Sequence, residues 1–98
     1  MKALPEVGQV VRSLRGRDQG RFFMVFARID SEYVLTVDGV LRKLNRPKKK
    51  KVRHLSCEPV YFHAIREKLE AGEPVTDSQI RRALKDAGYA ASDREKEA

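Results

Sequence analysis

The residues most able to do chemistry in this chain are cations gathered between positions 42 and 53. That stretch, RKLNRPKKKKVR, holds eight Lys or Arg residues and no acidic residue. Ammonium groups on consecutive residues neutralise phosphates without demanding a fixed geometry, and guanidinium groups add bidentate contacts to phosphates or base edges. Because adjacent lysines repel one another in a folded monomer, the run favours a polyanionic ligand over a merely solvated charged loop. We expect nucleic acid to be that ligand.

A second cationic element lies upstream, in the segment RGRDQGR at residues 15–21. Its two glycines, Gly16 and Gly20, give the backbone the freedom to approach phosphates closely, and arginines surround them. The segment lacks the Gly-Lys-Ser/Thr ending of a Walker loop and the spacing of GxGxxG. On these residues alone, an ordinary hairpin turn with surface arginines is an equally good interpretation. The complete set of candidate RNA-binding residues is Arg15, Arg17, Arg21, Arg42, Lys43, Arg46, Lys48, Lys49, Lys50, Lys51 and Arg53.

Catalytic and metal chemistry are poorly represented in the sequence. The soft-metal ligands follow no common zinc spacing and lack a fourth partner. Three aspartates lie in expected turns, where they favour turn hydrogen bonds over acid–base work. No nucleophile–base pair is evident, so we expect no enzyme activity, no metal, no cofactor and no small-molecule substrate. The residues weighed are His54, Cys57 and His63 for metal binding, and Asp18, Asp30 and Asp38 for acid–base chemistry.

The composition agrees with a binding protein that works through its surface. With 98 residues and a mass of 11.2 kDa, the chain has room for one small domain. A domain of this size buries only about 60–65% of its unfolded surface, which disfavours a deep active site. The net charge is +7, and it is unevenly spread: residues 1–55 carry +9, whereas residues 56–98 carry −2. The positive charge is thus focused on the N-terminal half.

The sequence also predicts where the protein acts. No segment has the apolar length of a signal peptide or a membrane span. The single cysteine excludes an intramolecular disulfide and fits a reducing compartment. A membrane-surface role is disfavoured because the lysine run adjoins no amphipathic helix with a basic face. We expect a cytoplasmic protein without a membrane partner.

The elements that must position these cations are short strands followed by helices, an α+β organisation. Five strands separated by turn residues favour a small, strongly bent, SH3-like barrel over residues 1–56, which includes the basic segment. Asp38-Gly39 is the strongest hairpin signal within it. The expected strands are residues 7–14, 22–29, 33–37, 40–44 and 52–55.

After Leu55 the apolar period changes from 2 to 3.6 residues, which predicts two short helices. The first starts near Pro59 and stops at Gly72. The second has a capping box, with Thr76 as N-cap and Gln79 three residues later, and ends at Gly88. We expect residues 57–89 to form a helical appendage packed on the barrel, and residues 90–98 to be a disordered polar tail.

The aromatic residues Phe22 and Phe26 alternate with the expected core face of their strand. One of them could be exposed and stack on an unpaired base. The sequence favours the other interpretation, in which both lie under the C-terminal helices or inside a tightly curved barrel.

The N-terminal half resembles a KOW motif. The likeness starts in VGQVVRSLRGRDQGR, continues through YVLTVDG and RKLNRPKKKKVRHL, and covers about residues 7–55. It is strongest toward large-subunit ribosomal proteins of archaea and eukaryotes and their short bacterial relatives. The chain departs from the motif at Phe23, where many KOW sequences have a third glycine. The resemblance implies an SH3-like barrel that binds ribosomal RNA.

Two hypotheses about function follow. In the first, the protein binds ribosomal RNA or the ribosome through a basic face of the barrel and is monomeric away from RNA. In the second, it is a protein-interaction module of the transcription or translation machinery. The second would use the mildly acidic helical segment, through Tyr61, Phe62, Ile80 or Leu84.

Overall fold

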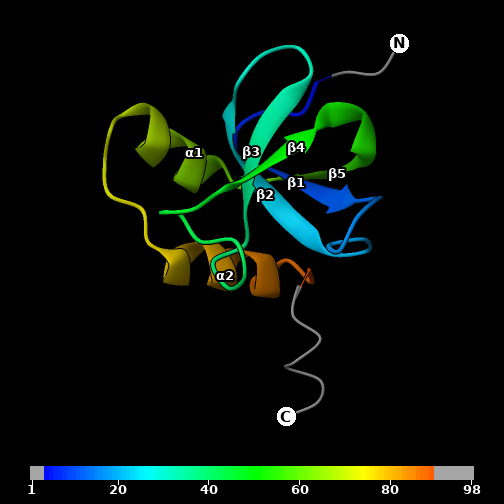
Figure 1. Ribbon diagram of the computed structural model, residues 1–98. Coiled ribbons are helices and arrows are strands. Elements are labelled where there is room, and N and C mark those ends of the chain that lie inside the picture. The colour runs from blue at the N-terminus through cyan, green and yellow to red at the C-terminus, as the bar shows by residue number, and fades with distance from the viewer. Residues whose placement is uncertain (1–3, 90–98) are drawn as a thin grey trace.

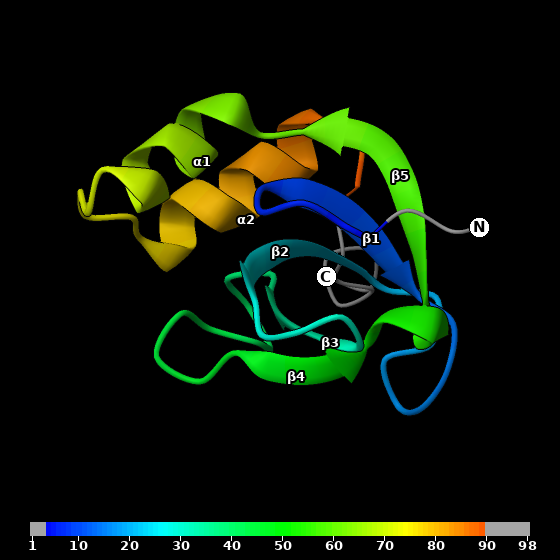
Figure 2. The same ribbon diagram turned by 90° about the horizontal axis from the view of Figure 1, so that it is seen from above.

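Five antiparallel strands form one curved sheet, which two helices cover on one face (Figures 1 and 2). This computed structural model describes residues 4–89, so the polar tail expected at residues 90–98 lies outside the described residues. The strand order is β4-β3-β2-β1-β5. The strands are β1 (Gln9–Ser13), β2 (Phe22–Arg28), β3 (Tyr33–Val37), β4 (Lys48–Lys51) and β5 (Leu55–Tyr61).

The sheet is not closed into a barrel, so that part of the prediction is wrong. The edge strands β4 and β5 are not paired with each other. A single turn of 3₁₀ helix, Val52–His54, leads the chain from one edge of the sheet to the other. The α+β class, the five antiparallel strands and the two C-terminal helices are confirmed.

The fourth predicted strand is also wrong, because residues 40–44 belong to a loop. The carboxylate of Asp38 holds that loop by accepting hydrogen bonds from the backbone N–H groups of Val40, at 2.9 Å, and Arg42, at 2.8 Å. The lysine run forms β4 instead, in which Lys48 lies opposite Thr36 of β3. Lysines suit such an edge strand because their charge discourages pairing with other chains.

The fifth strand begins where its prediction ended. Residues 52–54 form the 3₁₀ turn, and β5 then runs from Leu55 to Tyr61. Pro59, which we expected near a helix start, lies within β5. Proline lacks a backbone N–H, and this is tolerated here because β5 is an edge strand.

The helices are α1 (His63–Glu70) and α2 (Asp77–Asp86). The capping box of α2 is confirmed: the Gln79 N–H donates to Thr76 Oγ1 at 3.1 Å, and the Thr76 N–H donates to Gln79 Oε1 at 3.0 Å. Neither helix within residues 4–89 is long and apolar enough to cross a membrane.

The sheet buries apolar side chains on both of its faces, in two separate clusters. Phe22 and Phe26 are partly buried and pack against the cluster beneath the helices, as the favoured interpretation predicted. The cluster between sheet and helices contains Val10, Met24, Val37, Ile65, Ile80 and Leu84. The cluster on the other face contains Val11, Phe23, Val25, Val34, Val52 and Leu55.

Candidate nucleic-acid interface

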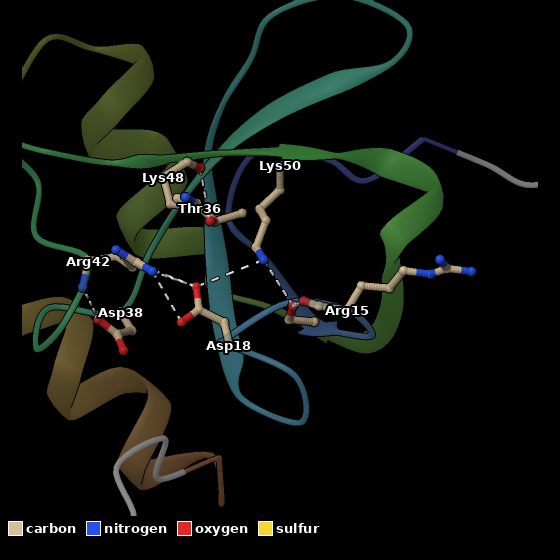
Figure 3. A network of polar contacts seen from close by, with 8 residues as sticks. Arg15, Asp18, Thr36, Asp38, Arg42, Lys48 and Lys50 are labelled. Carbon is tan, nitrogen blue, oxygen red and sulfur yellow. Dashed lines mark hydrogen bonds and ion pairs between the residues drawn. The ribbon is translucent and has the colours of Figure 1, made fainter.

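A buried carboxylate, Asp18, organises the basic side chains. It lies in the turn between β1 and β2 and is only 4% exposed. The Arg42 guanidinium donates to both carboxylate oxygens, with Nη2 at 3.0 Å from Oδ2 and 3.2 Å from Oδ1. Lys50 Nζ is 3.8 Å from Oδ2. Figure 3 shows Arg42 and Lys50 reaching Asp18 from two different segments, so one carboxylate joins the 15–21 turn, the 38–47 loop and β4.

Lys50 is held on more than one side. Its ammonium also donates to Ser13 Oγ at 3.1 Å, and its side chain is only 11% exposed. Burial lowers the pKa of Lys50; the Asp18 carboxylate opposes this, whereas the positive charges of Lys48 and Arg42 add to it. One hydrogen bond and one ion pair thus hold the Lys50 ammonium within the protein.

Further cations surround Arg42 and Lys50, and together these residues line a pocket of about 440 Å³. Arg15, Arg17 and Lys48 are exposed, and in Figure 3 the Arg15 side chain extends away from Asp18. Burial lowers the pKa of His54, and the nearby positive charge of Arg15 lowers it further. The shift favours the neutral imidazole, which can both donate and accept a hydrogen bond. The pocket is lined by Arg15, Gly16, Arg17, Asp18, Arg42, Lys48, Lys50 and His54.

The four consecutive lysines are divided between the two faces of β4. Side chains alternate along a strand, so Lys48 and Lys50 lie on the face of the pocket and Lys49 and Lys51 on the other. On that other face, Lys49 Nζ is 4.6 Å and Lys51 Nζ 5.8 Å from the ring centroid of Tyr33. This alternation relieves the repulsion that consecutive ammonium groups would otherwise experience.

The structure brings together only part of the predicted cationic set. Five members line the pocket, whereas the others lie on neighbouring elements. Arg21 is half-buried at the end of its turn, Lys49 and Lys51 are on the Tyr33 face of β4, and the rest are exposed. The pocket-lining members are Arg15, Arg17, Arg42, Lys48 and Lys50. The remaining members are Arg21, Lys43, Arg46, Lys49, Lys51 and Arg53.

Sequence reasoning missed the roles of Asp18 and Tyr33. Asp18 was expected to make turn hydrogen bonds, and its ionic partners lie too far along the chain to be identified from spacing. Tyr33 could have been found only from the register of β3 and β4, which places it opposite Lys51. Among residues 4–89, no group of three His, Cys, Asp or Glu side chains could hold a metal ion.

The helical surface of the second hypothesis differs from what was expected. Ile80 is 0% and Leu84 1% exposed, so neither can contact a partner protein. Phe62 is also partly buried against the same cluster. Tyr61 is 37% exposed and stacks with His63 at 5.8 Å between ring centroids.

Comparison with known proteins adds an independent line of evidence. No family model matches the chain. It is 29% identical over 83 residues to the large ribosomal subunit protein eL14 of Sulfolobus acidocaldarius, a match that covers 85% of this chain and 79% of that protein. The relative is a KOW-domain ribosomal protein. This weak homology confirms the resemblance to KOW-motif ribosomal proteins.

Proposed function

We propose that this chain is a ribosome-associated protein of the cytoplasm that binds ribosomal RNA and has no catalytic role. The observation that carries the proposal is the gathering of cations from three segments around the Asp18 pocket. Homology to a large-subunit ribosomal protein supports the choice of ribosomal RNA among polyanions.

The pocket cations divide into two roles. Arg42 and Lys50 are held by Asp18, so they fix the shape of the pocket and contribute positive potential. Arg15, Arg17 and Lys48 are exposed and free to meet phosphates. Five cations around one carboxylate leave a strongly positive site, and its paired members need no rearrangement when RNA arrives.

Neighbouring cations extend this surface. Lys43, Arg46 and Arg53 are exposed on the 38–47 loop and the 3₁₀ turn, whereas Lys49 lies on the opposite face of β4, against Tyr33. Contacts of this kind position a protein on the RNA backbone without reading its bases.

The salt dependence of binding tests the proposal. The triple variant Arg15→Gln, Arg17→Gln, Lys48→Gln is compared with wild type for binding to purified large-subunit ribosomal RNA. Three lost phosphate contacts should reduce the slope of log K against log salt by about 2–3 and weaken binding at least about tenfold at 150 mM salt. The matched control, Arg12→Gln, Arg28→Gln, Lys68→Gln, removes three positive charges from outside the pocket. Equal slopes and affinities for both variants would contradict the proposal.

A further inference from the structure

The exposed side of α2 carries three cations that belong to no site described above. Arg81, Arg82 and Lys85 are all exposed. Within the described part of the chain, none of the three is in an ion pair. With Ser78 and Asp86 they line a hollow of about 290 Å³. The hydroxyl of Ser78 accepts a hydrogen bond from Arg81 Nη2 at 3.3 Å.

These cations share one side of the helix because of the helical period. Ile80 and Leu84 face the sheet and are fully buried. Arg81 and Lys85 each follow one of these core residues and are four positions apart, so their side chains lie along the same edge of α2.

That edge is the one against which the basic loop packs. The backbone N–H of Leu44 donates to Asp77 Oδ1 at 2.8 Å. Gly39 approaches α2 so closely that a Cβ there would overlap the Asp77 carbonyl oxygen and stand 3.1 Å from the Arg81 nitrogen. Figure 1 shows the loop passing across α2. The cations of α2 thus adjoin the loop that carries Lys43 and Arg46.

Asp86 lines the same hollow and offsets one of the three positive charges, so an excess of two positive charges remains there. Glu70 is paired with Arg66 on α1, and Asp77 is engaged by the backbone of Leu44. The net charge of −2 for residues 56–98 therefore conceals a positive edge on α2.

We propose that Arg81, Arg82 and Lys85 form a second contact surface for the RNA backbone, continuous with the basic loop. The inference rests on the proposed function. One RNA segment would lie along β4, cross the 38–47 loop and reach α2. Continuity with the basic loop favours this ligand over an acidic protein, and the Ser78 hydroxyl adds a donor suited to phosphate oxygens.

The test uses three variants of the full chain, each lacking three positive charges. The α2 variant is Arg81→Gln, Arg82→Gln, Lys85→Gln. The pocket variant and the control are those already described. Binding to large-subunit ribosomal RNA is measured over a range of salt concentrations, after the thermal midpoints show that all variants fold. In the α2 variant, the slope of log K against log salt should be smaller by about 2–3, and binding should be at least about fivefold weaker than in the control.

A charge-preserving variant checks that the contact is to the backbone. The variant Arg81→Lys, Arg82→Lys, Lys85→Arg should keep the salt slope and the affinity of the wild-type protein. A loss of either would overturn a backbone contact. If the α2 variant behaves like the control while the pocket variant loses affinity, the inference is wrong and the proposed function stands; an acidic protein partner then becomes the better explanation of α2. If neither variant differs from the control, both the function and the inference are contradicted.

Discussion

Asp18 accepts hydrogen bonds from Arg42 and lies 3.8 Å from the ammonium of Lys50, although these partners are distant in sequence. An ion pair of this kind depends on which segments the fold brings together, and no local pattern encodes it. The sequence therefore offered the pocket cations as candidates, whereas the carboxylate that holds two of them could be identified only from the structure. Because Arg42 and Lys50 are paired with Asp18, these two cations have a structural role.

Replacing Asp18 with Asn should lower the stability of the fold without weakening RNA binding. Arg42 and Lys50 would lose their counter-ion while partly buried, which should lower the free energy of unfolding by about 1–3 kcal/mol. This is less than the cost of breaking a fully buried pair, since Arg42 is 29% exposed. RNA affinity of the folded variant should be retained or increased, because a negative charge has been removed. Urea denaturation and RNA titration measure the two quantities.

The matched control is Asp30→Asn. The Asp30 carboxylate is exposed and accepts hydrogen bonds from the N–H groups of Glu32 and Tyr33, which an Asn oxygen can also accept. Wild-type stability of Asp18→Asn, or a stable variant that no longer binds RNA, would show that Asp18 does not act as the internal counter-ion.

At the scale of elements, the junction between the 38–47 loop and α2 links the basic segment to the helices. Gly39 has a φ of 78°, and its missing side chain allows the close approach to Asp77. The Asp-Gly pair was predicted to make a hairpin turn. It instead begins a loop, and the glycine is needed both for backbone conformation and for contact with α2.

Gly39→Ala tests this junction. A methyl group there would strain the backbone and overlap the Asp77 carbonyl oxygen, so the free energy of unfolding should fall by more than about 1 kcal/mol. Gly72→Ala is the control, since Gly72 has a similar φ of 73° but open space around the added Cβ. Denaturant unfolding of both variants should show a larger loss for Gly39→Ala. Equal losses would mean that contact with α2 contributes nothing beyond backbone strain.

Local signals account for the elements that could be predicted. Strands β1, β2 and β3 are apolar or β-branched and bounded by turn residues, and the capping box marks the start of α2. The strand β4 was missed because lysine is a poor strand former, and only pairing with β3 makes Lys48–Lys51 extended. Whether the sheet closes into a barrel depends on how its two edge strands meet. The residue pattern within a single strand carries no information about this.

At the scale of the whole molecule, charge and packing divide the protein into an apolar scaffold and a basic surface. The helices bury Ile65, Ile80 and Leu84 against the sheet, so their apolar faces stabilise the fold. The uneven charge, +9 over residues 1–55, makes the pocket side strongly positive, and this is the surface that we propose to bind RNA. We propose that the edge of α2 extends it.

The measurement that tests this account most directly is crosslinking of the protein to RNA in cells, followed by sequencing of the recovered fragments. We predict fragments of large-subunit ribosomal RNA clustered at one site, and their loss from the variant Arg15→Gln, Arg17→Gln, Lys48→Gln at equal protein level. Recovery of RNA fragments scattered over many transcripts, or a ribosomal cluster unchanged in that variant, would contradict it.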